Sequence, residues 1–166
     1  MKIGIDIDDT LVDTSKSFDS LIKKYNINFN KKYKDNWTKE EKEFIFSNYL
    51  SEILIGAKIK EDAKEVLNYL YNKGYELIVI TARSNKYCKN IEKFTKDMIQ
   101  KENIKISKFY FGQNKKSDIA KQLNLDLMID DSEYVCDNMK KENIDYILFG
   151  DKIKTWKEVL GYIERK

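Results

Sequence analysis

Histidine and proline are both absent from this 166-residue chain, and cysteine and arginine occur only twice each. Without histidine, imidazole general bases, histidine triads and the common zinc ligand sets are excluded. Acid and base chemistry must therefore come from carboxylates, lysine, tyrosine or cysteine. Cys88 and Cys136 lie far apart and outside any CxxC pattern. We expect both to be reduced packing residues and expect no disulfide.

The sequence also lacks long apolar runs and a strong excess of one charge. No run approaches the length of a membrane span, and the first residues, MKIGIDIDDT, hold too few apolar positions for a signal peptide. We therefore expect a cytoplasmic protein that does not enter the membrane. Lysine and arginine total 31 against 28 acidic residues, and this dispersed net charge of +3 argues against nucleic acid as a partner. The composition does not indicate an oligomeric state.

Five short apolar segments are typical of strands, and each is followed by a helical pattern. The strands are expected at residues 2–6, 75–80, 108–111, 126–130 and 146–149. The helices are expected at residues 15–25, 38–54, 61–73, 85–102, 116–123, 132–141 and 155–164. Thr38 and Glu41 form a capping box, and Gly74 provides a helix stop. This alternation predicts an α/β fold, with a three-layer, doubly wound parallel sheet.

One connection is longer than a crossover helix requires. About seventy residues separate the first two strands, which indicates an insertion after the first strand. We predict a core domain made of residues 1–14 and 57–166 and a small helical cap made of residues 15–56. The cap is rich in aromatic residues: Phe18, Tyr25, Phe29, Tyr33, Trp37, Phe44, Phe46 and Tyr49. At helical spacing these favour a small apolar core, and stacking of one of them on a base is the alternative.

Polar side chains gather where the predicted strands end. Asp6 and Asp8 follow the first strand, Thr81 the second, and Asp130 and Asp131 the fourth. Ligands of open α/β sheets bind beyond the carboxyl ends of the strands, so these groups are expected to meet there. Lysines 115 and 116 begin the next helix, where free amide groups favour anions.

Carboxylates so close together raise one another's pKa unless a cation lies between them. A few oxygen ligands completed by water suit Mg²⁺ that also holds a phosphate, whereas the dense ligand loop typical of Ca²⁺ is missing. Each fragment also has a purely structural interpretation. Asp8, Asp9 and Thr10 suit a helix start, and Asp130 and Asp131 suit the cap of the helix near Ser132. Their coincidence at several strand ends favours a site.

Four segments in this order resemble the haloacid dehalogenase superfamily of phosphotransferases. They are IDIDDTL at 5–11, VITAR at 79–83, the lysine of NKKSD at 114–118, and LMIDDS at 127–132. The resemblance spans essentially the whole chain and implies a Rossmann-like core with a cap. ITAR, the late IDD and the small cap are similar to the 5'-nucleotidase or deoxyribonucleotidase branch.

The resemblance implies a role for each matching residue. Asp6 matches the nucleophile that forms an aspartyl-phosphate, and Asp8 matches the acid that protonates the leaving oxygen and then activates water. Thr81 matches the hydroxyl that holds the phosphoryl group, and Lys116 the lysine that stabilises its charge, with Lys115 left open as the alternative. The implied Mg²⁺ ligands are Asp6, Asp8 through its backbone carbonyl, Asp130 and the additional Asp131. The expected phosphate or substrate contacts are Asp9, Thr10, Ala82 and Arg83.

These features predict a Mg²⁺-dependent phosphomonoesterase for small molecules, with nucleoside or deoxynucleoside monophosphates as the preferred substrates. Asp8 argues against a dehalogenase, because a halide leaving group needs no proton donor. Two alternatives stay open: a phosphatase of another small phosphometabolite, and a non-catalytic module that senses phosphate or binds a partner. A polynucleotide end phosphatase would need a basic track that the scattered charge does not offer.

Overall fold

The computed structural model describes residues 1–27 and 37–166. Five strands form one all-parallel sheet in the order β3-β2-β1-β4-β5. The strands are β1 (Lys2–Ile5), β2 (Glu76–Ile80), β3 (Lys108–Tyr110), β4 (Leu127–Asp130) and β5 (Asp145–Leu148). Every strand lies within one residue of its predicted limits, and the predicted α/β class with a parallel sheet is confirmed.

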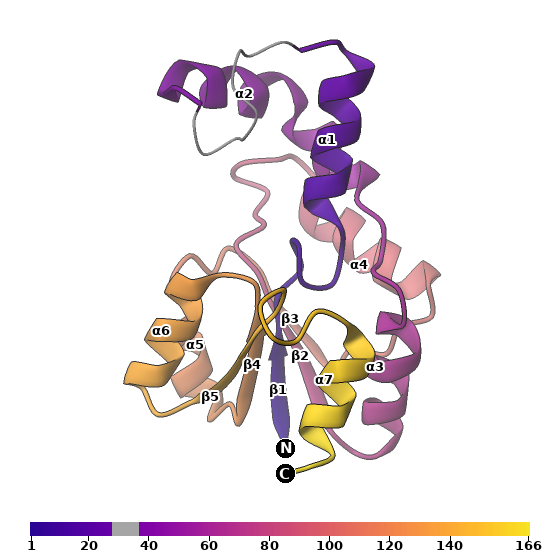
Figure 1. The fold of residues 1–166 in the computed structure, drawn as a ribbon, viewed down its shortest axis with the longest axis vertical. Coiled ribbons are helices and arrows are strands. Elements are labelled where there is room, and N and C mark those ends of the chain that lie inside the picture. Colours follow the sequence, from indigo (N-terminus) through magenta and orange to yellow (C-terminus); the bar gives the residue numbers. More distant parts are fainter. Residues whose placement is uncertain (28–36) are drawn as a thin grey trace.

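Seven helices are present in the described part of the chain. They are α1 (Thr14–Lys24), α2 (Lys39–Gly56), α3 (Ala63–Asn72), α4 (Ile91–Lys101), α5 (Lys116–Leu123), α6 (Glu133–Lys141) and α7 (Trp156–Ile163). Helices α5 and α6 lie on one side of the sheet, and α3, α4 and α7 lie on the other (Figure 1). The sheet is therefore the middle of three layers, as predicted. Among the described helices, none is both long and apolar enough to cross a membrane.

The two faces of the sheet hold separate apolar cores. Along β2, Leu77 and Val79 pack with the α3, α4 and α7 side, and Ile78 and Ile80 pack with the α5 and α6 side. Successive side chains of a strand point to opposite faces, so a strand covered on both faces must be apolar throughout. This accounts for the uninterrupted apolar sequence of β2.

Helices α1 and α2 pack against each other beyond the carboxyl ends of the strands, on the side of the sheet opposite the two termini (Figure 1). Leu21, Ile45 and Ile53 are the buried residues between them, with Phe18, Trp37 and Tyr49 partly buried around them. Phe18, Trp37 and Tyr49 therefore contribute to an apolar core of the cap, as expected, whereas Tyr25, Phe44 and Phe46 are exposed. Phe29 and Tyr33 lie outside the described residues. The exact division into core and cap domains stays a prediction.

The prediction of a helix from residue 85 was wrong, because α4 begins only at Ile91. Asn90 adopts a left-handed backbone conformation with φ of 62°, which a continuous helix excludes. Asn85 and Glu92 instead form two reciprocal hydrogen bonds between side chain and backbone, at 3.1 and 3.2 Å. Residues 84–90 therefore form a loop beside the carboxyl end of β2. All the other helices end within two residues of their predicted limits.

Candidate active site

Three buried charged side chains from distant parts of the chain meet beyond the ends of β1 and β4. Asp6 directly follows β1, Asp130 ends β4, and Lys116 begins α5. The Nζ atom of Lys116 lies 2.5 Å from an oxygen of Asp6 and 2.7 Å from an oxygen of Asp130. The neighbouring Lys115 is exposed and pairs with Asp118 at 2.9 Å. The structure thus places Lys116, and not Lys115, between the carboxylates.

This cluster carries one more buried negative charge than its lysine can neutralise. Burial and the charge of Asp130 raise the pKa of Asp6 to about 8, although Lys116 opposes the shift. The pKa of Lys116 is also raised, because two adjacent carboxylates outweigh the effect of its own burial. Lys116 therefore keeps its proton, and either a proton or a cation must balance the second carboxylate.

Asp131 extends the cluster toward the surface. Oxygen atoms of Asp6, Asp130 and Asp131 all lie within 4.8 Å of one another. Burial and the nearby charges of Asp130 and Asp9 raise the pKa of Asp131 to about 6. Three carboxylates at this spacing, with one side open to water, fit the ligand preferences of Mg²⁺. Asp130 is oriented by the backbone N–H of Ser132, which donates to it at 3.0 Å.

The carboxylate of Asp8 is held by Arg83 and Thr14. The Nε and Nη2 atoms of Arg83 donate to the two oxygens of Asp8 at 3.0 and 2.7 Å, and the Thr14 hydroxyl donates at 2.6 Å. Burial would raise the pKa of Asp8, but the hydrogen bonds and charge of Arg83 outweigh it, so the pKa is lowered. The role of the Asp8 backbone carbonyl as a metal ligand, which the family resemblance implies, stays a prediction.

Arg83 was expected to contact the phosphate or the substrate, which stays a prediction, and in the structure its guanidinium lies on Asp8. Its Nη1 atom donates to the hydroxyl of Thr95, on α4, at 3.0 Å. Sequence reasoning missed both Thr14 and Thr95 as partners of this group. Thr95 is fully buried on the inner face of an amphipathic helix. A hydroxyl at such a position is the one signal in the sequence that could have indicated it.

The remaining predicted contacts lie in different surroundings. Thr81 is fully buried, and its hydroxyl accepts from the backbone N–H of Arg83 at 3.2 Å. Ala82 is exposed in the loop after β2. Thr10 is fully buried, its hydroxyl has no hydrogen-bond partner in the described part of the chain, and its carbonyl accepts from the Trp156 indole at 3.2 Å. Substrate contacts by these residues stay predictions.

Asp9 stabilises the start of a helix, which is the structural role that its sequence also suits. Its carboxylate accepts from the backbone N–H and the hydroxyl of Ser15, both at 2.7 Å, at the beginning of α1. Its backbone is left-handed, with φ of 57°, so the chain turns sharply here. This turn separates Asp8, which faces Arg83, from the residues that lead into α1. Asp9 also lines two cavities beside the site.

The first of these cavities lies between the cap helices and has a volume of about 340 Å³. Its lining includes the polar residues Asp9, Thr14 and Ser15, and the Thr14 hydroxyl donates to Asp8 at 2.6 Å. The rest is mainly apolar: Phe18, Trp37, Lys42, Ile45, Phe46, Leu50, Ile53 and Leu54. The second cavity, of about 500 Å³, is lined by Asp9, Asp131, Glu133 and Asp151 among others, and opens beside the acidic cluster.

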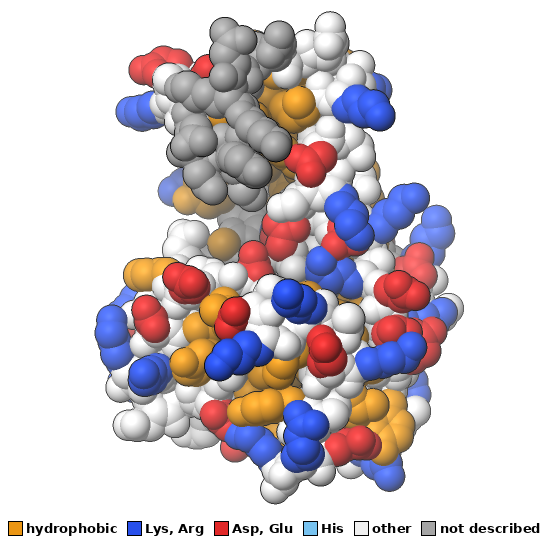
Figure 2. All heavy atoms as spheres, in the orientation of Figure 1, with side chains coloured by type: hydrophobic (Ala, Val, Ile, Leu, Met, Phe, Trp, Pro, Cys, Tyr) orange, Lys and Arg blue, Asp and Glu red, His pale blue; other side chains and the backbone are white. Residues whose placement is uncertain are grey.

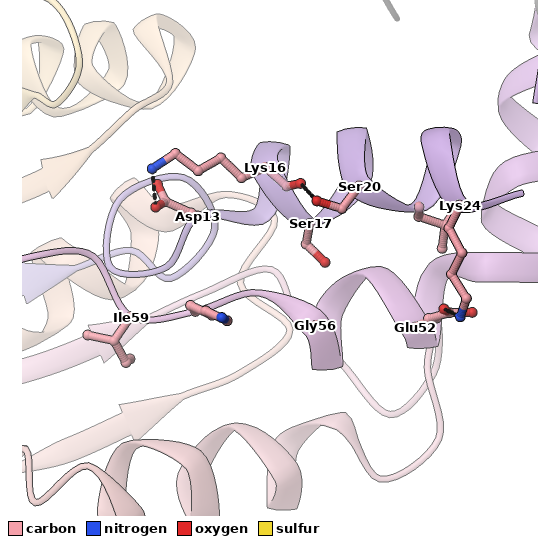
Figure 3. Close-up of a pocket in the computed structure, with 10 residues that line it drawn as sticks. Asp13, Lys16, Ser17, Ser20, Lys24, Glu52, Gly56 and Ile59 are labelled. Carbon is pink, nitrogen blue, oxygen red and sulfur yellow. Dashed lines mark hydrogen bonds and ion pairs between the residues drawn. The ribbon is translucent and has the colours of Figure 1, made fainter. Parts of the chain in front are cut away.

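A further cavity, of about 570 Å³, lies between α1 and the C-terminal end of α2 with the segment that follows it (Figure 3). Four of its charged residues form two ion pairs: Lys16 with Asp13 at 2.7 Å and Lys24 with Glu52 at 2.6 Å. None of the catalytic candidates lines it. On the face of the core drawn in Figure 2, acidic and basic side chains are likewise interspersed, with no continuous basic track. The two cavities that Asp9 lines thus lie closer to the candidate catalytic residues than this one does.

The sequence matches no family model and no curated protein. Solved structures do match the fold. A haloacid dehalogenase-like hydrolase from Streptococcus pneumoniae has a TM-score of 0.68 at 16% identity, over 98% of this chain and 97% of that one. A predicted phosphatase from Clostridium acetobutylicum has a TM-score of 0.67 at 16% identity, over 99% and 98% of the two chains. A predicted phosphoglycolate phosphatase from Haemophilus somnus has a TM-score of 0.63 at 17% identity, over 97% and 96%. These likenesses show that the chain has the haloacid dehalogenase-like fold.

Proposed function

We propose that this chain is a Mg²⁺-dependent phosphomonoester hydrolase of the haloacid dehalogenase superfamily that works through an aspartyl-phosphate. The main support is the contact of the Lys116 ammonium with both Asp6 and Asp130, at 2.5 and 2.7 Å, at the carboxyl edge of the sheet. Asp131 completes the acidic set. A fold shared with several hydrolases supports the reaction class, although fold alone leaves the substrate open.

In the proposed first step, an oxygen of Asp6 attacks phosphorus while the bond from phosphorus to the leaving oxygen breaks. Because Arg83 favours the ionised form of Asp8, Asp8 must first take up a proton from solvent. It then gives this proton to the leaving oxygen, so a neutral alcohol departs. In the second step, the Asp8 carboxylate takes a proton from water as the water oxygen attacks phosphorus. The bond from phosphorus to Asp6 then breaks, and phosphate and free Asp6 are released.

Asp6 must be ionised to attack, and nearby positive charge is needed to stabilise its carboxylate. Lys116 holds a positive charge 2.5 Å from its oxygen and so favours the ionised form. Asp6, Asp130 and Asp131 would hold Mg²⁺, with the Asp8 carbonyl as a further ligand. When bound, the metal neutralises the carboxylates and the phosphate, which lets an anion approach an anion.

We further propose that the substrate is a nucleoside or deoxynucleoside monophosphate. The 340 Å³ cavity beside Thr14 and Asp9 supports this, because its mainly apolar wall suits a planar aromatic group on the leaving side of the phosphate. Phe18, Trp37 and Phe46 are the aromatic residues of that wall. A small aliphatic ester, such as the phosphoglycolate named for one structural neighbour, would leave most of this wall uncovered.

Release of inorganic phosphate from a panel of esters tests both parts. The panel contains the common nucleoside and deoxynucleoside monophosphates, 2-phosphoglycolate and sugar phosphates, each with Mg²⁺ or with EDTA. The reaction class requires turnover with Mg²⁺, loss of turnover with EDTA, and loss in Asp6→Asn at an unchanged circular dichroism spectrum. Turnover of sugar phosphates or 2-phosphoglycolate in preference to nucleotides would overturn only the substrate assignment. No turnover of any ester, with phosphate analogues still bound, would favour a non-catalytic phosphate-sensing module.

A further inference from the structure

Arg83 makes an unusually complete set of contacts for one side chain. The side chain is only 1% exposed. Two of its nitrogens donate to the two oxygens of Asp8, at 3.0 and 2.7 Å, and the third donates to Thr95 at 3.0 Å. Arginine occurs at only one other position in a chain that otherwise uses lysine. A lysine ammonium is a point charge and cannot form this planar, two-pronged contact.

Asp8, which the planar guanidinium fork of Arg83 contacts, is exposed on one side only. The Asp8 side chain keeps 34% of its surface accessible, while Arg83 lies against its inner side. One oxygen of Asp8 accepts from both Thr14 and Nη2 of Arg83, at 2.6 and 2.7 Å. The other oxygen accepts from Nε of Arg83 at 3.0 Å and has capacity for one more partner. The fork thus fixes which oxygen of Asp8 is available to a proton or a leaving group.

Thr95 anchors the fork from a separate element. It lies on α4, which packs against the sheet, and its hydroxyl holds Nη1, the one guanidinium nitrogen that does not contact Asp8. The backbone N–H of Arg83 is held by the hydroxyl of Thr81, at the end of β2. Both ends of the Arg83 residue are therefore attached to rigid secondary structure, so the guanidinium has little freedom to move away from Asp8.

We propose that Arg83, anchored by Thr95, is the positioning residue for the acid and base Asp8. This proposal rests on the proposed function, because it assumes that Asp8 transfers the proton. The oxygen that is bonded to both Thr14 and Nη2 stays an acceptor throughout. The other oxygen carries the proton, releases it to the leaving oxygen as the bond to phosphorus breaks, and regains a proton from the attacking water.

Two esters of similar size separate this role from a structural one. p-Nitrophenyl phosphate releases a stable phenolate that needs little protonation, whereas 4-nitrobenzyl phosphate releases an alkoxide that needs a proton. With enzyme in excess and Mg²⁺ present, the first turnover is followed by release of the nitrophenol or the nitrobenzyl alcohol. This measures only the attack by Asp6, and it excludes the later hydrolysis, which needs Asp8 for both esters.

Loss of the fork is expected to act selectively on the ester that needs the proton. In Arg83→Gln the first-turnover rate should fall about 100-fold for 4-nitrobenzyl phosphate and less than about 5-fold for p-nitrophenyl phosphate. Arg83→Lys, which keeps the charge without the fork, should show the same selectivity. In an Asp8→Asn background, Arg83→Gln should add less than about 3-fold, because the two residues act as one unit. Arg165→Gln, the other arginine, serves as the matched control.

Thr95→Val provides a milder variant if Arg83→Gln does not fold. It removes the anchor and keeps the side-chain volume, and we expect a loss of about 3- to 10-fold on 4-nitrobenzyl phosphate only. Equal losses on both esters, or losses that multiply with Asp8→Asn, would overturn the positioning role and leave the hydrolase assignment intact. If the wild-type protein turned over neither ester, both proposals would fall together.

Discussion

The ammonium group of Lys116 lies 2.5 Å from a carboxylate oxygen of Asp6, although 110 positions separate the two residues in the chain. The contact forms because β1 is central in the sheet and α5 begins at the same carboxyl edge. Asp130, from the adjacent strand β4, holds the same ammonium at 2.7 Å. A single lysine thus connects two strands and one helix at the point where the proposed chemistry occurs.

Replacing Lys116 should therefore abolish most activity. We expect Lys116→Met to lower kcat/KM about 100- to 1000-fold at saturating Mg²⁺, because a charge aimed at the developing transition state is lost. Lys115→Met is the matched control: that side chain is exposed and pairs with Asp118 away from the carboxylates, so we expect a change below about 2-fold. Steady-state phosphate release measures both, and circular dichroism checks the fold. Equal losses would contradict the assignment of Lys116.

The buried charge excess also predicts how stability depends on pH without metal. The pKa of Asp6 is about 8 in the folded protein against an ordinary value of 3.8. Between these values Asp6 holds more protons in the folded state than in the unfolded state, so its contribution to the free energy of unfolding falls as the pH rises from about 4 to about 8. Above pH 8 this contribution is constant. Urea denaturation in EDTA at several pH values measures it.

Asp6→Asn provides the control for this pH dependence, because an amide does not titrate. The difference between the wild-type and Asp6→Asn curves should decline over the same range and level off near pH 8. Added Mg²⁺ should stabilise the wild-type protein most at high pH, where no proton must leave the site first. Parallel curves for the two proteins across this range would show that Asp6 is ionised at neutral pH even without metal.

Much of this site follows from simple rules about sheets. Apolar strands with acids at their ends predict that Asp6 and Asp130 meet, because the carboxyl ends of parallel strands share an edge. The contact between Arg83 and Asp8 was not predictable in the same way. It depends on the loop at 84–90, for which the sequence pattern predicted a helix. It also depends on the left-handed backbone of Asn90, because α4 begins only after this residue and carries Thr95. Sequence periodicity does not report such local backbone reversals.

Asp131 should contribute to metal affinity more than to chemistry. It belongs to the acidic cluster but lies on its exposed side and does not contact Lys116. We expect Asp131→Asn to weaken Mg²⁺ binding about 10- to 100-fold, while kcat at saturating Mg²⁺ falls less than about 10-fold. Titration calorimetry and a Mg²⁺ dependence of kcat measure the two effects. Asp137→Asn, an exposed acid on α6 outside the cluster, should leave both unchanged.

The apolar cavity in the cap should favour substrates with an aromatic leaving group. Phe46 lines it and is 54% exposed, so its removal should affect an aromatic ligand more than folding. An aromatic contact contributes about 1.4 kcal/mol, which corresponds to about a tenfold change in affinity. Phe46→Ala should therefore raise KM about tenfold for nucleoside monophosphates, with kcat nearly unchanged, because the contact lies on the leaving group and away from the reacting atoms.

Two comparisons decide whether this effect comes from the cavity. Phe44 lies on the same helix and is 48% exposed, but it does not line the cavity. Phe44→Ala should therefore leave KM for nucleotides within about 2-fold of the wild-type value. 2-Phosphoglycolate has no aromatic group, so Phe46→Ala should also leave its KM within about 2-fold of the wild-type value. A similar rise in KM for both substrates would mean that Phe46 supports the cap as a whole, and that the aromatic wall does not select the leaving group.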